Sequence, residues 1–92
     1  MEVTAKGFNL SPANQEFIAA KAEKLKNRQV TVQSLHIESK DDQFTTQIVA
    51  KPISGAAFNV RKSNQHFMAS VTDAIHTCLS KADERKHRTI GR

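Results

Sequence analysis

Four histidines and one cysteine are the residues of this 92-residue chain whose chemistry is most often catalytic or metal-binding. The histidines show no His-x-x-x-His spacing and no carboxylate partner, so the pattern predicts no metal site. Cys78 falls on an apolar stripe, where a buried thiol behaves as a small hydrophobe with a raised pKa. His76 points about 200° away from Cys78 around a helix, so the two do not predict an activated nucleophile.

The glycines and paired acids also lack a catalytic pattern. Neither Gly7 nor Gly55 belongs to a phosphate-binding glycine-rich loop, and both are typical of turns. Asp41 and Asp42 stand in a polar turn without a second carboxylate cluster, which favours turn geometry over acid–base catalysis. We therefore predict that the chain is not an enzyme and has no catalytic residue, no cofactor and no small-molecule substrate.

Basic residues are the stronger functional signal. Fourteen Lys and Arg against nine Asp and Glu give a net charge of +5, which favours a polyanionic partner. Lys21, Lys24 and Arg28 fall within roughly 60° of arc on a helix and predict a basic ridge beside its apolar face. Such side chains neutralise phosphates and make affinity fall with salt.

A second basic ridge, made of Lys81, Arg85, Lys86 and Arg88, is predicted at the C-terminal end of the last helix, where cations also complement the helix dipole. Either ridge alone is more typical of a solvated charged face, but the two together favour binding. The five Phe residues are needed for the core, so a platform for stacking bases is not expected. The candidate RNA-binding residues are Lys21, Lys24, Arg28, Arg61, Lys62, Lys81, Arg85, Lys86 and Arg88, with Lys51 as a supporting charge.

The elements that must position these residues follow from periodicity and turn signals. Ser11 and Pro12 predict a helix start, by a hydroxyl cap and a proline in the first turn. The apolar phase slips between Val32 and Leu35, which predicts a bulge or an edge. The predicted elements are strands at 2–6, 30–38, 44–51 (ending before Pro52) and 56–62, and helices from 12 to about 28 and from about 64 past Ala82 to a frayed end.

The predicted order is β-α-β-β-β-α in one domain, residues 1–92. This is an α+β, dsRBD-like fold, a four-stranded sheet with two helices packed on one face. The lone cysteine suits a reducing compartment, and the sequence shows no apolar leader or membrane-spanning run, so we expect a cytoplasmic location and no membrane partner. The first strand is short enough to be an edge, which leaves a monomer or a weak dimer.

Four segments spread over the whole chain match the pattern of one known family. They are Gly7-Phe8-Asn9-Leu10-Ser11, Glu16-Phe17-Ile18 with Lys21 and Lys24-Leu25, Met68-Ala69-Ser70-Val71 with Ile75, and Arg85-Lys86-His87-Arg88. On these segments the chain resembles the hibernation-promoting factors and ribosome-associated inhibitors.

The resemblance implies binding to the small ribosomal subunit and its rRNA, where mRNA and tRNA pass, and inactivation of idle ribosomes during stress or stationary phase. The family's RNA-facing positions map onto Lys21, Lys24, Arg85, Lys86 and Arg88, with Arg28, Arg61, Lys62 and Lys81 as weaker additions. The family usually has an acidic residue, a glycine and an Asp-Met-Tyr segment before the last helix. Here residues 62–68 read Lys-Ser-Asn-Gln-His-Phe-Met, which favours a divergent paralogue. The family's long members carry a second, dimerising domain and its inhibitor branch a longer tail, neither of which this sequence shows, so we expect short-form behaviour.

Two other hypotheses remain open. An adaptor with the same fold would bind an acidic protein through the same helices. A nonspecific binder of duplex RNA would show equal affinity for any A-form helix. The ribosome hypothesis requires both basic ridges on one contiguous surface of the two helices.

Overall fold

The computed structural model describes the backbone of residues 1–53 and 55–90, and the side chains of residues 1–53 and 55–82. Its elements follow the order β-α-β-β-β-α, which confirms the predicted fold class. They are β1 (Glu2–Lys6), α1 (Pro12–Asn27), β2 (Val30–Lys40), β3 (Gln43–Pro52), β4 (Phe58–Asn64) and α2 (Phe67–Ile90).

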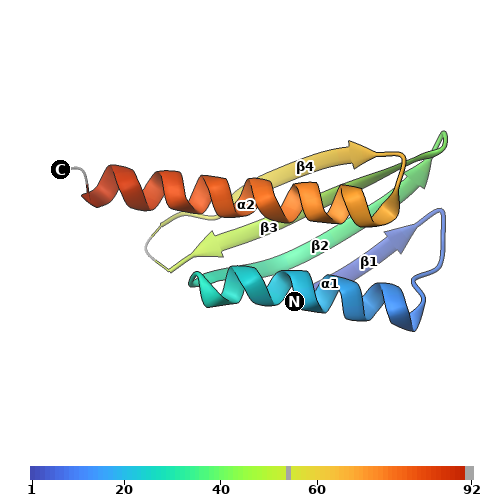
Figure 1. Ribbon diagram of the computed structural model, residues 1–92, viewed down its shortest axis with the longest axis horizontal. Coiled ribbons are helices and arrows are strands. Elements are labelled where there is room, and N and C mark those ends of the chain that lie inside the picture. Colours follow the sequence, from blue (N-terminus) through green and yellow to red (C-terminus); the bar gives the residue numbers. More distant parts are fainter. Residues whose placement is uncertain (54, 91–92) are drawn as a thin grey trace.

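One sheet holds the four strands in the order β1-β2-β3-β4. β1 runs parallel to β2, and the other neighbours are antiparallel. The predicted edge position of β1 is confirmed, and β4 forms the other edge. Both helices pack on the same face, α1 against β2 and α2 against β3 and β4. Figure 1 shows that α1 and α2 run in the same direction, so their C-terminal ends lie at the same end of the molecule.

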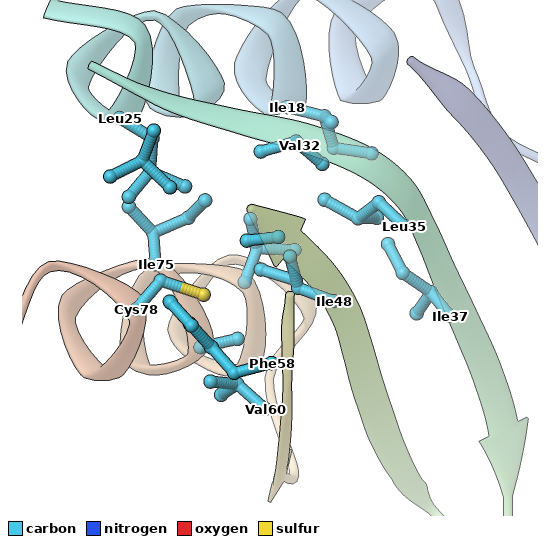
Figure 2. Packing of buried hydrophobic residues seen from close by; sticks show 14 residues of the cluster. Ile18, Leu25, Val32, Leu35, Ile37, Ile48, Phe58, Val60, Ile75 and Cys78 are labelled. Carbon is cyan, nitrogen blue, oxygen red and sulfur yellow. The ribbon is translucent and has the colours of Figure 1, made fainter. Parts of the chain in front are cut away.

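Alternation along the strands separates the two faces of the sheet, because successive side chains of a strand point to opposite sides. The face under the helices carries the core residues Leu35, Ile37, Ile48 and Val60, which are almost completely buried. Ile18 and Leu25 of α1 and Ile75 and Cys78 of α2 pack against this core from the helix side, as Figure 2 shows. The opposite face carries no helix in the described part of the chain, and we call it the open face.

Local signals in the sequence explain several element boundaries. The Ser11 hydroxyl accepts a hydrogen bond from the Asn14 backbone N–H at 3.1 Å, and Pro12 begins α1 as predicted. The predicted slip in β2 is a register shift between Val32 and Ser34. Gly7 has a φ of +86°, and a Cβ there would collide with the Ser39 carbonyl oxygen, so this turn requires glycine.

Other predicted boundaries were wrong by a few residues. Pro52 belongs to β3, where it pairs with Val30 of β2. The pairing of β3 with β4 stops at Ala50, so Pro52 has no neighbour in β4 that would need the backbone N–H that proline lacks. β4 begins at Phe58 rather than at Ala56, because Phe58 is the first residue that pairs with β3, opposite Ala50.

β2 continues past Glu38 to Lys40, because a two-residue turn lets it pair up to Gln43. Asn64 is not helical: it is the last residue of β4 and pairs with Phe44, so α2 begins at Phe67. The predicted fraying of the last residues falls outside the described residues.

Candidate nucleic-acid interface

The basic ridge of α1 lies on the side of that helix that faces α2. Lys21, Lys24 and Arg28 follow Phe17 at intervals of four, three and four residues, so the four side chains form one stripe. The Phe17 ring lies 6.3 Å from the ring of Phe67 on α2, which fixes the direction of this stripe. The cations therefore border the groove between the two helices.

Like charge is concentrated within this ridge. The positive charge of Lys24 lowers the pKa of Lys21, and desolvation adds to the effect. The Lys21 Nζ also lies 5.4 Å from the centre of the Phe17 ring, within the range of a cation–π contact. An anion bound between Lys21 and Lys24 would relieve their repulsion, which is the property expected of a phosphate-binding surface.

Lys62 and Lys81 lie on the other flank of α2. Lys81 follows Ser70 by three helical turns, so it shares the side of α2 on which the Ser70 hydroxyl donates a hydrogen bond to the Lys62 carbonyl oxygen at 3.2 Å. Both lysine side chains are exposed, and Lys62 belongs to the edge strand β4. They are thus separated from the α1 ridge by the width of α2.

Arg85, Lys86 and Arg88 belong to the last turns of α2, which Figure 1 shows extending past the ends of the strands. Their side chains lie outside the described residues. Because the two helices are parallel, these turns lie at the same end of the molecule as the C-terminal half of the α1 ridge. Both helices thus belong to one layer, while Lys81 lies on the other flank of α2, so the contiguous surface that the ribosome hypothesis requires stays a prediction.

Arg61 is not brought together with the other candidates. It pairs with Gln47 in the β3–β4 register and follows the buried Val60, so its side chain emerges on the open face. Lys51, paired with Thr31, lies on the same open face. The nine candidate residues hence form no single surface.

Sequence reasoning missed the opposite wall of the groove and one further cation. Thr72 and Leu79 are half-buried on the side of α2 that faces α1, and their spacing of seven residues was the available signal. Lys26 is exposed in the last turn of α1 but lies across the helix from the ridge. It lines a shallow groove beside Val30 and Met1 instead.

The side chains that could take part in covalent chemistry or bind a metal form no catalytic arrangement in the described residues. Cys78 is fully buried, and desolvation raises its pKa to about 11, as predicted for a core thiol. His76 is exposed on the outer side of α2. Asp41 and Asp42 form the predicted turn, both with positive φ. Within the described residues, His, Cys, Asp and Glu nowhere gather in a group of three that could hold a metal ion.

Comparison with known proteins places this arrangement in a family. Residues 1–89 match the model of the family described as sigma 54 modulation protein / S30EA ribosomal protein. The chain belongs to this family. The resemblance inferred from its sequence is thereby confirmed. A search of curated protein sequences found no match.

Solved structures with the same fold include two bacterial proteins. The N-terminal domain of Protein Y from Thermus thermophilus matches with a TM-score of 0.81 at 10% identity, covering 90% of this chain and 93% of that one. A ribosomal subunit interface protein from Coxiella burnetii matches with a TM-score of 0.76 at 16% identity, covering 92% and 94%. At these identities the likeness shows a shared fold.

The segment in which this S30EA-family chain departs from the family pattern has a clear structural role. Phe67 opens α2 and packs at centroid distances of 5.9 Å against both Phe8 and Phe44. Met68 is 57% exposed. Asn64 accepts a hydrogen bond from the His66 backbone N–H at 3.0 Å and so supports the bend before the helix. The divergence therefore keeps the start of α2 anchored while removing acidic charge beside it.

Proposed function

We propose that residues 1–92 act as a single ribosome-binding domain. The domain binds the small ribosomal subunit through its rRNA, near the path of mRNA and tRNA, and holds idle ribosomes inactive during stress or stationary phase. It acts in the cytoplasm by occupying space and neutralising phosphates, without catalysing a reaction, as a monomer or a weak dimer.

The observation that carries this proposal is the position of the α1 ridge. Lys21, Lys24 and Arg28 face the groove beside α2 on the only layer of helices in the described structure, and both helices end toward one pole of the molecule. Lys24 and Arg28 are exposed and Lys21 is half-buried, and such a row of cations suits an RNA backbone, which is recognised by its phosphates and its shape. The family and the name of the Coxiella burnetii ribosomal subunit interface protein favour ribosomal RNA as the target.

This mode of binding has a defined physical signature. Each phosphate that a lysine or arginine neutralises releases condensed counterions, so affinity falls steeply as salt rises. Backbone contacts give affinity without reading sequence, so the target must be selected by the shape of the site. A domain placed in the decoding channel inhibits by excluding mRNA and tRNA.

Sedimentation of purified ribosomes through sucrose gradients tests the proposal. Wild type should comigrate with small subunits, and Lys21→Glu with Lys24→Glu should lose roughly two orders of magnitude in affinity, because two attractive contacts become repulsive. Lys6→Glu with Lys40→Glu is the matched control, since it changes net charge equally on the open face. Wild type that stays in the light fractions at low salt would overturn the proposal and favour an adaptor for an acidic protein.

A competitor duplex separates the ribosome from RNA in general. Excess short A-form RNA should displace little of the protein from small subunits if the shape of the ribosomal site contributes to binding. Displacement at stoichiometric competitor would instead show a nonspecific duplex binder.

A further inference from the structure

The open face of the sheet differs in character between its two halves. On β1 and β2 it carries opposite charges, and Lys6 Nζ lies 3.7 Å from a Glu38 carboxylate oxygen. On β3 and β4 it carries cations and neutral polar groups but no acid in the described part of those strands. The open-face residues of that half, here called the β3–β4 patch, are Thr45, Gln47, Val49, Lys51, Asn59, Arg61 and Ser63.

Both cations of the β3–β4 patch are available to a partner. Lys51 and Arg61 are exposed, and no described carboxylate lies within ion-pair distance of either. Arg61 stands opposite Gln47, and Lys51 lies four residues further along β3, roughly 13 Å away at the rise of a strand. Two such cations are far enough apart to contact different phosphates.

We propose that the β3–β4 patch is a second RNA-backbone surface, so that the domain bridges two RNA segments, one on the helix side and one on the open face. This inference rests on the proposed function and assigns Arg61 and Lys51 to a separate contact. The molecule measures 17 Å along its shortest axis. Figure 1 is viewed down this axis, with the helices in front of the sheet. Two basic surfaces on opposite sides of so thin a body suit a wedge between RNA elements.

The side chains of the patch favour RNA over a protein partner. Protein interfaces concentrate their binding energy in buried aromatic and large aliphatic anchors. Val49 is the one apolar member of the patch. Four of the Phe side chains pack together on the helix side, and Phe58 is buried in the core. Amide and hydroxyl groups such as those of Gln47 and Asn59 hydrogen-bond phosphate and 2′-OH groups and accompany Arg and Lys at RNA backbones.

Capture of two RNA duplexes by one protein tests the bridge. A short biotinylated RNA duplex is immobilised and loaded with wild type, and a second, fluorescent duplex is then added. Wild type should retain the second duplex. Lys51→Glu with Arg61→Glu should load onto the first duplex but retain at least tenfold less of the second, because the remaining surface is occupied. Lys6→Glu with Lys40→Glu, equal in charge change on the other half of the same face, should behave like wild type.

The outcomes separate this inference from the proposed function. If the Lys51→Glu, Arg61→Glu variant retains the second duplex at the wild-type level, the bridge is overturned. The same result is expected if two associated copies of the protein each hold one duplex, so that case also counts against the bridge. On ribosomes, the same double variant should bind roughly tenfold more weakly than its matched control. Equal ribosome affinity of the two variants would reject the second surface and leave the proposed function standing, whereas wild type that never sediments with ribosomes would reject the proposed function itself.

Discussion

The two helices lie side by side on one sheet face, yet they hold it differently. α1 is fastened by two fully buried aliphatic side chains, Ile18 and Leu25, one on each of two distant turns. α2 buries a nearly continuous row of mostly smaller residues, which includes Ser70, Ala74 and Cys78. Small side chains allow close approach to the sheet, while large ones fill the space between the helices. α1 is thus held to the sheet by few buried residues and presents the basic ridge, whereas α2 covers most of the core.

The largest effect should come from α1, because its attachment depends on so few residues. Leu25→Ala should lower the free energy of unfolding by about 3 kcal/mol, since a fully buried leucine leaves a cavity that the core cannot refill. Leu79→Ala on α2 removes the same atoms from a half-buried position and should cost about 1 kcal/mol. Urea unfolding followed by circular dichroism gives both values. Equal losses would show that the two helices are attached alike.

The thiol in the α2 row should make stability depend on alkaline pH. Burial raises the pKa of Cys78 from 9.0 to about 11, so the folded state binds the proton more tightly than the unfolded chain. Its contribution is complete below pH 9.0 and is lost as pH rises toward 11, on the order of 2 kcal/mol in all. Unfolding measured across this window should show a steeper decline in wild type than in Cys78→Ala. Parallel curves would contradict a buried thiol.

A buried hydroxyl pair should matter next. The Thr46 hydroxyl lies 2.8 Å from that of Ser70, which in turn donates to the Lys62 carbonyl oxygen, so Thr46 is the donor in the first bond. Ser70→Ala leaves the buried Thr46 hydroxyl without its acceptor and should cost about 1.5 kcal/mol. Ser80→Ala is the matched control, exposed on the same helix, and should change stability by less than ~0.5 kcal/mol. Thermal unfolding distinguishes the two.

The smallest effect contrasts one cation on each helix. Lys24→Glu, in the α1 ridge, should weaken ribosome binding roughly tenfold, while Lys81→Glu, on the β4 flank of α2, should weaken it about two- to threefold through net charge alone. Cosedimentation at several salt concentrations measures both affinities. A larger loss for Lys81→Glu would move the interface to the β4 flank.

The fold was largely predictable because each local signal agreed with the global arrangement. Alternation and helical spacing identify the core face, and Ser11, Pro12 and Gly7 mark boundaries by their own chemistry. The ends of β3 and β4 were missed because pairing between strands decides them: Pro52 is tolerated where β4 has not yet begun. Local composition carries no information about that offset.

The candidate site was predicted less well. The α1 ridge follows from spacing within one helix, so Lys21, Lys24 and Arg28 emerge from the sequence together. The position of Arg61 depends on which strand face meets the helices, and that of Lys81 on which side of α2 meets β4. Both are properties of packing between distant segments, and net charge alone groups residues that the fold separates.

The connection between β1 and its neighbour also has a consequence for how the protein is made. β2 and β3 are joined by the two-residue turn at Asp41 and Asp42, so their pairing closes only a very short loop. The hydrogen bond between Thr4 of β1 and His36 of β2 instead spans 32 residues. Loop closure over that span costs about 2 kcal/mol more than over a tight turn. During synthesis, which starts at the N-terminus, β1 therefore leaves the translating ribosome without a partner and must wait for the hairpin before it can join the sheet.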